Sequence, residues 1–291
     1  MSVRRNLSDY TSLKIGGPVF RWLEPENADG ILQAISIAEK SKKGLAVIGK
    51  GTNILAQDKG FDGVLVTLGK GFDYIEKDEG DVVRVGAATP IARLVKKCAE
   101  WGLGGCEFLA GIPGSFGGAL FMNAGVRDAC DAEKSREIKD IVLDVDVVDL
   151  RDRKRRTLSR ADIDFSYRSS GLDGKCIISA RIRLQKAQES AIIKGIDSYM
   201  EKRQWMQKLK SPSAGSVFKN PDNKNPAGML IEKCDLKGRR IGGAEISVLH
   251  ANFIANTGNA ASKDVLALIE LAKKTVKQKF NIDLELELKL L

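Results

Sequence analysis

The segment GIPGSFGGALFMNAG, residues 111–125, most narrowly limits the backbone that this chain can adopt. Four glycines fall between Gly111 and Gly118, and Pro113 stands among them. Glycine tolerates positive φ and the close approach of another backbone, whereas proline fixes its own φ and donates no hydrogen bond. We therefore expect a specific, non-repetitive loop that is pressed closely against a neighbour.

A second glycine-rich segment, VIGKGTNIL at residues 47–55, directly follows an apolar strand pattern. Gly-x-Gly after a strand can expose successive backbone N–H groups as an anion-binding nest. The third glycine and long helix of a dinucleotide-binding fingerprint are missing, and so is the P-loop pattern. Taken singly, each of the two segments is more typical of a tight turn than of a ligand cradle.

The length and composition of the chain are those of a globular protein with about two domains. The chain has 291 residues, of which 43% are hydrophobic and 29% are charged, and a domain takes about 150 residues. No run approaches the ~20 apolar residues that a membrane span needs. The sequence MSVRRNLSDYTSLKIGG lacks the apolar stretch of a signal peptide. We expect a cytoplasmic protein without a membrane partner.

The cysteines do not predict a metal site or a disulfide framework. The five are Cys98, Cys106, Cys130, Cys176 and Cys234, an odd number without a C-x-x-C pair, and the chain has one histidine. That composition excludes an ordinary zinc site. The cysteines are interpreted as small core residues in a reducing compartment.

The formal net charge of +9 raises the question of a nucleic-acid partner. The run RDRKRR, residues 151–156, fits either a basic binding patch or a solvated hairpin turn between two alternating strand patterns. No interleaved aromatic residues or DNA-reading module accompany it, which favours the turn and no nucleic-acid partner. Positive potential also suits an enzyme with phosphate-rich ligands.

Three helices are predicted from apolar periodicity. The first has an apolar face of Ile31, Leu32, Ile35 and Ala38; the second begins near Pro90 and aligns Ile91, Leu94, Val95 and Cys98; the third is expected to be capped by Ser262 and aligns Val265, Leu268, Ile269, Ala272 and Val276. A further helix is expected around Ala191 to Leu209, with a domain boundary near residue 188.

Five strands are predicted at residues 45–49, 63–68, 82–87, 141–150 and 176–184. In the last, Ile178, Ala180, Ile182 and Leu184 are expected on one face, and Ser179, Arg181 and Arg183 on the other. The order of helices and strands indicates an α+β protein without the regular βαβ spacing of a doubly wound sheet.

The two glycine-rich segments, taken in order, resemble the FAD-binding domain of the vanillyl-alcohol-oxidase type, in which two α+β subdomains hold a pyrophosphate. Further motifs narrow the resemblance: TSLKIGG (11–17), GKGTNIL (49–55), FLAGIPGSFGGALFMNAG (108–125), FSYRSS (165–170), PSAGSVFKNP (212–221), AGMLIEKCDLKG (227–238), ISVLHANFIANTG (246–258) and LELEL (284–288). In that order they resemble the UDP-N-acetylenolpyruvoylglucosamine reductase (MurB) family of flavoenzymes, from about Thr11 to Glu287.

The resemblance implies an α+β fold with a two-subdomain FAD-binding part of the vanillyl-alcohol-oxidase (PCMH) type and a C-terminal α+β substrate-binding domain. FAD-binding subdomain 1 is expected at residues 1–78, subdomain 2 at 79–187 and the C-terminal domain at 188–291.

The resemblance also implies FAD as cofactor and NADPH as hydride donor. Because neither glycine-rich segment contains a histidine or cysteine, we expect the FAD to be held non-covalently. The side chain of Lys50 fits a solvated position equally well. The residues expected at the FAD are Ile48, Gly49, Lys50, Gly51, Thr52, Asn53, Ile54, Gly111, Pro113, Gly114, Ser115, Gly117, Gly118, Ala119, Asn123 and Gly125.

Three residues match the family's catalytic positions. Arg168 in SYRSS corresponds to the arginine that contacts the substrate carboxylate, Ser216 in AGSVFKNP to the proton-donating serine, and Glu287 in LELEL to the C-terminal glutamate that works with them. Without the resemblance, the three residue types fit a surface charge, a turn residue and a solvated strand residue.

Four further residues are expected at the substrate. Lys219 and Asn220 lie in the FKNP match and suit the nucleotide of the substrate or NADPH. Tyr167 fits a core position as well as a substrate contact. His250 lies in the HANFI match, and a single histidine of this kind more often has a structural role.

The family resemblance implies reduction of the enolpyruvyl group of UDP-N-acetylglucosamine enolpyruvate to UDP-N-acetylmuramate, in peptidoglycan synthesis. The expected partners are then the UDP-sugar and NADPH, without a metal, and the sequence is compatible with a monomer. Two alternatives stay open at this point. One is another FAD-dependent oxidase or dehydrogenase of the same fold, and the other is a non-catalytic protein that binds nucleotide-sugars or nucleic acid.

Overall fold

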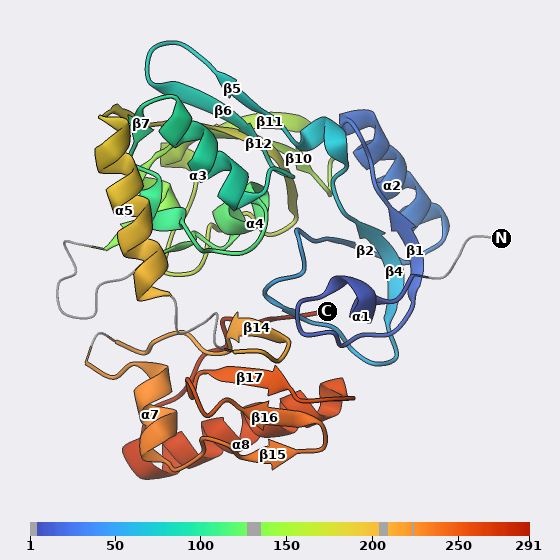
Figure 1. Ribbon diagram of the computed structural model, residues 1–291. Coiled ribbons are helices and arrows are strands. Elements are labelled where there is room, and N and C mark those ends of the chain that lie inside the picture. Colours follow the sequence, from blue (N-terminus) through green and yellow to red (C-terminus); the bar gives the residue numbers. More distant parts are fainter. Residues whose placement is uncertain (1–4, 127–134, 204–208, 223) are drawn as a thin grey trace. The chain divides into compact units, whose positions relative to one another are not determined.

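The computed structural model describes residues 5–126, 135–203, 209–222 and 224–291, and its ribbon is drawn in Figure 1. The chain divides into two compact units. The larger unit contains residues 22–50 and 63–204, and the smaller unit contains residues 1–21, 51–62 and 205–291. The division into 1–78, 79–187 and 188–291 stays a prediction.

In the part of the chain that the structure describes, the helical elements are short except for α2, α3, α5 and α8. The α-helices are α1 (Leu7–Tyr10), α2 (Ala28–Lys40), α3 (Ile91–Glu100), α4 (Phe116–Phe121), α5 (Glu189–Lys202), α7 (Ala227–Lys233) and α8 (Ser262–Phe280), and the 3-10 turns are η1 (Lys70–Phe72), η2 (Glu107–Leu109), η4 (Ile138–Asp140) and η5 (Arg160–Asp162).

Strands of both units alternate with these helices along the chain. They are β1 (Val19–Leu23), β2 (Gly44–Val47), β3 (Ile54–Leu55), β4 (Phe61–Val66), β5 (Ile75–Lys77), β6 (Val82–Gly86), β7 (Leu103–Gly104), β8 (Gly125–Val126), β9 (Arg136–Glu137), β10 (Val142–Asp149), β11 (Arg155–Ser159), β12 (Lys175–Arg183), β13 (Gln185–Lys186), β14 (Ser213–Ser216), β15 (Arg240–Ile241), β16 (Ala244–Ile246), β17 (Phe253–Asn256) and β18 (Lys289–Leu290).

The larger unit is built on an antiparallel sheet in the order β11-β10-β12-β6-β5. Helices α3 and α4 bury their apolar side chains against one face of this sheet (Figure 1). A second helix layer is α2, whose buried side chains Ile31 and Ile35 meet Val148, Cys176 and Ile178. Strands β2 and β4 pair in parallel beside α2. The predicted helices at residues 31–38 and 91–98 are therefore confirmed.

A β-bulge in β12 makes one expected strand pattern wrong. Asp146 of β10 pairs with Ser179, whereas Val147 pairs with Ile177, so that Ile178 is the extra residue. The bulge moves Ile178 into the cluster with α2, while Ala180 and Ile182 face α3 and α4. Ile178 therefore does not share a face with Ala180, as strict alternation had predicted.

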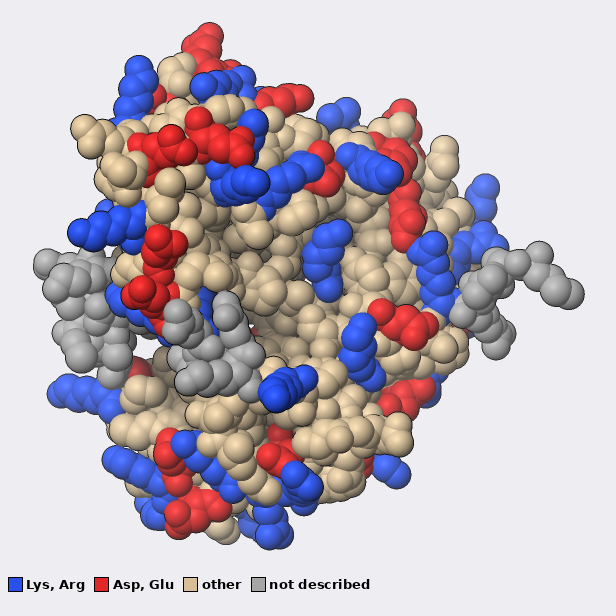
Figure 2. All heavy atoms as spheres, in the orientation of Figure 1, with Lys and Arg blue, Asp and Glu red and all other residues tan. Residues whose placement is uncertain are grey.

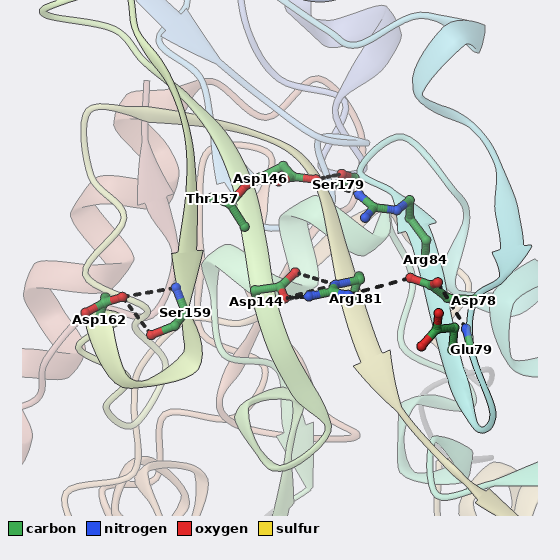
Figure 3. A network of polar contacts seen from close by, with 10 residues as sticks. All are labelled: Asp78, Glu79, Arg84, Asp144, Asp146, Thr157, Ser159, Asp162, Ser179 and Arg181. Atoms are coloured by element: carbon green, nitrogen blue, oxygen red, sulfur yellow. Dashed lines mark hydrogen bonds and ion pairs between the residues drawn. The ribbon is translucent and has the colours of Figure 1, made fainter.

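The sheet face opposite α3 and α4 carries a network of charged side chains (Figure 3). Arg84 bonds to Asp146 at 2.8 Å, and Thr157 and Ser179 donate hydrogen bonds to the same carboxylate at 2.6 and 2.7 Å. Burial alone would raise the pKa of Asp146, but the two hydroxyl hydrogen bonds and the Arg84 charge together lower it. Ser179, which was expected on the face opposite Ala180, is buried, and this bond satisfies its hydroxyl.

The basic run at residues 151–156 is the expected hairpin turn between β10 and β11. Arg156 pairs with Asp152 and Asp149, and Arg153 pairs with Glu39. On the face shown in Figure 2, Lys and Arg side chains are interspersed with Asp and Glu side chains. Within the described residues, no helix is long and apolar enough to cross a membrane.

The predicted core role of the cysteines is confirmed at three positions. Cys98, Cys106 and Cys176 are buried free thiols, and Cys234 is partly buried. A hydrogen bond with Cys98 and burial raise the pKa of Cys106, and burial raises the pKa of Cys176 to about 12. Cys130 lies outside the described residues.

Two predicted helix ends are corrected by the structure. Helix α5 ends at Lys202 rather than near Leu209, and residues 204–208 lie outside the described part. Helix α8 begins at Ser262, which was expected to be its cap. Ala261 precedes the helix instead, and its N–H donates to Asp264 at 2.9 Å.

The smaller unit has a four-stranded sheet in the order β14-β17-β16-β15, packed against α8, which in turn packs against α7. A hydrogen bond from another segment fixes the start of α8. The Asp58 carboxylate accepts the Ser262 N–H at 2.9 Å and the Ser262 hydroxyl at 2.8 Å. The carboxylate satisfies a helix-terminal N–H and lies at the positive end of the helix dipole.

His250 lies within the turn between β16 and β17, in a packed position. Its Nδ1 accepts the Asn252 N–H at 3.2 Å, and its ring centroid lies 5.1 Å from that of Phe253. A Cβ on Gly228 of α7 would lie only 2.9 Å from the imidazole. Burial, and then the charge of Lys237, lower the pKa of His250, while Glu232 opposes them.

We expect Asp58→Ala to lower the free energy of unfolding by about 1–2 kcal/mol, because it removes the cap of α8. Asp58→Asn should lose less, since its amide oxygen can still accept a hydrogen bond. Urea denaturation of both variants checks this, with Lys59→Ala, a neighbouring exposed side chain, as control. Equal stability of Asp58→Ala and the control would contradict the capping role.

The lowered pKa of His250 predicts a pH-dependent contribution to stability. Below the ordinary histidine pKa of about 6.5, the unfolded chain takes up a proton that the folded chain does not, so stability falls as the pH falls. Between about pH 7.5 and about pH 5.5, the melting temperature should therefore fall further in the wild type than in His250→Asn. Parallel melting curves across this range would show that His250 does not titrate differently in the two states.

Candidate active site and cofactor-binding loops

The expected loop at residues 111–125 is in part a short helix. Ser115 caps α4 by accepting the Gly118 N–H at 3.4 Å. The N–H groups of Phe116 and Gly117 donate to Thr89 O and Ala87 O at 2.8 and 2.9 Å. A Cβ on Gly117 would lie 2.7 Å from the Cβ of Ala87. Close tertiary packing therefore overrides the low helix propensity of glycine here.

In the larger unit the two glycine-rich segments meet backbone to backbone. A Cβ on Gly49 would lie 2.6 Å from Ser115 Oγ and 3.7 Å from Gly118 Cα. A Cβ on Gly118 would meet only Ser115 Oγ, at 3.4 Å. The contact is formed by glycine backbone and the Ser115 hydroxyl, and a pyrophosphate could approach such a glycine backbone closely. The Phe116 and Gly117 amides already bond to the protein and are therefore not free donors for a phosphate.

The other half of the GKGTN segment belongs to the smaller unit. Gly51 has φ +67, and a Cβ there would lie 3.1 Å from Thr11. Its carbonyl accepts the Ser12 N–H at 3.0 Å. Asn53 donates from Nδ2 to the Glu287 carbonyl at 3.1 Å, and its own carbonyl accepts the Lys289 N–H at 3.1 Å. One of the expected cofactor residues is thereby bonded directly to an expected catalytic residue.

Arg168 lies in a two-residue turn with a strained backbone. Ser166 and Ser169 exchange N–H to carbonyl hydrogen bonds at 3.0 and 3.1 Å, which leaves Tyr167 and Arg168 at the tip. Arg168 has φ +59, at a turn position that favours glycine. Strain of this kind at a charged residue is characteristic of functional sites. The guanidinium lies 4.9 Å from the Tyr167 ring centroid and donates to Gly125 O at 3.3 Å.

Asn123 holds the Arg168 turn from the glycine-rich segment. It is fully buried and has φ +42. Its Nδ2 donates to Ser166 O at 2.9 Å and to Glu137 at 3.0 Å, and its Oδ1 accepts the Lys139 N–H at 3.2 Å. These bonds occupy the side chain, and the Asn123 N–H donates to Leu120 O at 3.0 Å, so the expected flavin contact would have to come from its backbone carbonyl.

Sequence reasoning missed Arg203, which follows α5. It donates hydrogen bonds to Ala110 O at 2.5 Å and to Phe108 O at 3.3 Å, so it ties the helix end to the FLAGIPG segment. Burial, and then the like charge of Arg168, lower the pKa of Arg203 to about 10. An arginine near a helix end carries no sequence signal that distinguishes it from a solvated charge.

Ser216 and Glu287 come together in the smaller unit. Ser216 ends β14 and pairs with Phe253 of β17. The following residue, Val217, accepts the Glu287 N–H at 2.9 Å. The side chains of both Ser216 and Glu287 are half-buried. Two of the three expected catalytic residues therefore lie on neighbouring segments of one unit, and Arg168 belongs to the larger unit.

Two expected substrate residues flank the same segment. Lys219 donates its N–H to Glu285 O at 2.8 Å and pairs with the Glu285 carboxylate at 2.5 Å. The Asn220 side chain accepts the Ala227 N–H at 3.0 Å and so caps α7. Their expected contacts with a nucleotide, like that of His250, stay predictions.

An open polar cavity of about 440 Å³ lies elsewhere in the smaller unit. None of the expected catalytic, cofactor or substrate residues lines it. Its lining consists of Lys14, Lys210, Ser211, Pro212, Asn256, Thr257, Gly258 and Asn259.

Comparison with known proteins agrees with these features. Residues 21–158 match the family model of an FAD binding domain, and residues 207–291 match that of the UDP-N-acetylenolpyruvoylglucosamine reductase C-terminal domain. These matches confirm FAD as the cofactor type and the α+β combination of an FAD-binding fold with a C-terminal domain.

Relatives that match this chain over nearly their whole length are named UDP-N-acetylenolpyruvoylglucosamine reductase. The chain is 40% identical to UDP-N-acetylenolpyruvoylglucosamine reductase 1 of Bacillus cereus, over 99% of this chain and 94% of that protein. It is 38% identical to the reductase of Bacillus subtilis, over 98% and 92% of the two chains. The crystal structure of the Thermus caldophilus reductase (MurB) matches with a TM-score of 0.81 and 33% identity, over 99% and 98% of the two chains. This chain belongs to the UDP-N-acetylenolpyruvoylglucosamine reductase family of flavin-dependent oxidoreductases, which act in cell-wall synthesis.

Proposed function

We propose that this protein uses NADPH and non-covalently held FAD to reduce the enolpyruvyl group of UDP-N-acetylglucosamine enolpyruvate, which yields UDP-N-acetylmuramate. The observation that supports this most directly is the hydrogen bond from the Glu287 N–H to the carbonyl of Val217, the residue that follows Ser216. Ser216 and Glu287 match catalytic positions of the family, and the fold brings them together from distant parts of the sequence. The strained turn at Arg168 is a second, independent support.

The substrate chemistry explains the residue types. An enol ether conjugated to a carboxylate accepts hydride at its terminal carbon, and negative charge then moves into the carboxylate. When bound, reduced FAD supplies this hydride, after its own reduction by NADPH. One proton must then be added at the adjacent carbon. The protein therefore has to stabilise a developing anion and deliver a single proton.

Arg168 is assigned to the substrate carboxylate. A guanidinium is a planar bidentate donor whose charge does not titrate near neutral pH. Its interaction strengthens as negative charge develops, which favours the transition state over the ground state. The turn that carries it is held by Asn123 and by the Ser170 hydroxyl, which donates to Phe121 O at 2.9 Å. These bonds keep the strained Arg168 backbone in place.

Ser216 is assigned to protonation of the intermediate. A neutral hydroxyl can donate a proton locally without bringing a competing charge close to the carboxylate. Glu287 is assigned to orienting a water or proton for the same intermediate. Substrate contacts are assigned to Lys219, Asn220, His250 and Tyr167. For such a contact, Lys219 would exchange its ion pair with Glu285 for one with a phosphate.

FAD would be held by the glycine-rich segments that meet at Gly49 and Gly118. Backbone contact through glycine allows the pyrophosphate to come close, and each charge-assisted hydrogen bond is correspondingly strong. Gly51 and Asn53, which follow in the same sequence segment, belong to the smaller unit and are also assigned to FAD.

The direct test is an assay of the purified protein with UDP-N-acetylglucosamine enolpyruvate and NADPH. We expect one NADPH oxidised for each UDP-N-acetylmuramate formed, and FAD released into the supernatant by acid precipitation. UDP-N-acetylglucosamine, which lacks the enolpyruvyl group, serves as the control substrate. Absence of NADPH oxidation by the FAD-loaded protein would contradict the proposal, and flavin retained in the acid pellet would contradict non-covalent binding.

We expect Ser216→Ala to slow the substrate-dependent reoxidation of the flavin by about 10²–10⁴-fold, the usual contribution of a general acid. Reduction of the flavin by NADPH should stay close to the wild-type rate, because the serine acts only after hydride transfer to the substrate. Stopped-flow absorbance separates the two half-reactions, with Ser213→Ala on the same strand as control. Slow reduction with normal reoxidation would remove Ser216 from this role.

A further inference from the structure

The main-chain pairing of β14 with β17 becomes irregular just where the expected catalytic serine stands. Ser213 pairs with Ala255 and Ser216 with Phe253, and the register shifts between these two pairs. The partner strand β17 begins at Phe253, and the chain before it is the turn that contains His250, whose carbonyl accepts the Phe253 N–H at 3.0 Å. The backbone ladder with this partner therefore continues only to Val217 and does not reach Phe218.

The side chain of Asn252 holds Phe218, where this ladder has ended. Its Oδ1 accepts the Phe218 N–H at 2.9 Å, and its Nδ2 donates to Phe218 O at 2.8 Å. Its backbone carbonyl accepts the Val217 N–H at 2.8 Å. The carboxamide thus acts as an additional peptide group that satisfies both polar atoms of Phe218. Asn252 and Phe218 are both buried, so water cannot substitute for these bonds.

The opposite edge of the same dipeptide holds the C-terminal segment. Val217 O accepts the N–H groups of Glu287 and Leu288 at 2.9 and 3.2 Å, and Phe218 forms a bridge with Leu286. Val217 and Phe218 therefore lie between Asn252 on one side and the segment of Glu287 on the other.

We infer that Asn252 is a positioning residue for the proton-delivery step, an assignment that rests on the proposed function. It fixes Val217 and Phe218, and these two residues set the position of Ser216 along the chain and of Glu287 across the strand pair. A shift of about 1 Å in such a constellation can cost about 10²-fold in rate. The bond from the Asn252 N–H to His250 Nδ1 holds Asn252 itself.

The same strand offers a matched control. Asn256 is also buried in β17, but its Nδ2 donates to Leu13 O at 3.1 Å and its Oδ1 accepts the N–H groups of Gly258 and Ala260 at 3.1 and 3.2 Å. Its side chain thus bonds to segments that carry neither Ser216 nor Glu287. Asn252→Asp and Asn256→Asp each replace a buried amide donor by a carboxylate oxygen, so both test the loss of a buried hydrogen bond.

The experiment compares the two half-reactions of the FAD-loaded enzyme in Asn252→Ala, Asn252→Asp and Asn256→Asp. For the Asn252 variants we expect reoxidation by substrate to slow by about 10–10²-fold, with NADPH-dependent flavin reduction and FAD content close to wild type. Asn256→Asp should keep the wild-type reoxidation rate, even if its melting temperature falls by as much as that of Asn252→Asp. Asn252→Asp keeps the side-chain volume and provides the measurement if Asn252→Ala does not fold.

A double variant identifies the residue through which Asn252 acts. If it positions Ser216, Asn252→Asp combined with Ser216→Ala should be little slower in reoxidation than Ser216→Ala alone. The assignment would be overturned if the reoxidation rate of the double variant showed the product of the two single losses. It would also be overturned if folded Asn252 variants reoxidised at the wild-type rate, or if Asn256→Asp lost as much reoxidation rate as they do. A wild-type enzyme that fails to reduce the enolpyruvyl substrate would instead overturn the proposed function itself.

Discussion

The smaller unit depends on hydrogen bonds that join segments from distant parts of the chain. Strand β18 pairs in parallel with β3, and Asn53 reaches from the glycine-rich segment to the Glu287 carbonyl. Asp58, in the same early segment, caps α8. Each bond satisfies a backbone group that burial would otherwise leave costly. The position of Glu287 is therefore set by early and late segments together.

Two strained residues in the larger unit show how an arginine can be held on a short turn. Arg168 and Asn123 both adopt positive φ, a conformation that costs of order 1–3 kcal/mol when the residue is not glycine. The bond from Asn123 to Ser166 O joins the two positions, and Glu137 and the Lys139 N–H complete the bonding of Asn123. The hydrogen bonds of the buried Asn123 carboxamide thus offset the backbone strain of the Arg168 turn. Without them, the turn would relax to an unstrained conformation.

Local patterns predicted most elements because their causes lie within the elements. Apolar periodicity was sufficient for α2 and α3, and flanking alternation for the hairpin at residues 151–156. Local patterns failed where a residue that is distant in the sequence determines the local structure. The bulge at Ile178 depends on pairing with β10, the helical turn after Ser115 on packing against Ala87, and the start of α8 on Asp58. None of these partners lies within the window of a local pattern.

The sequence by itself determined the family, the cofactor type and the α+β class, because ordered motifs and composition are properties of the chain alone. It also identified Arg168, Ser216 and Glu287 as candidates through those motifs. Only the tertiary structure placed Glu287 beside the residue after Ser216, bonded Asn123 to the Arg168 turn and set Asn252 against Phe218. The physical reason is that a buried peptide group takes its hydrogen-bond partner from whichever segment the fold brings within about 3 Å, and sequence distance does not limit that choice.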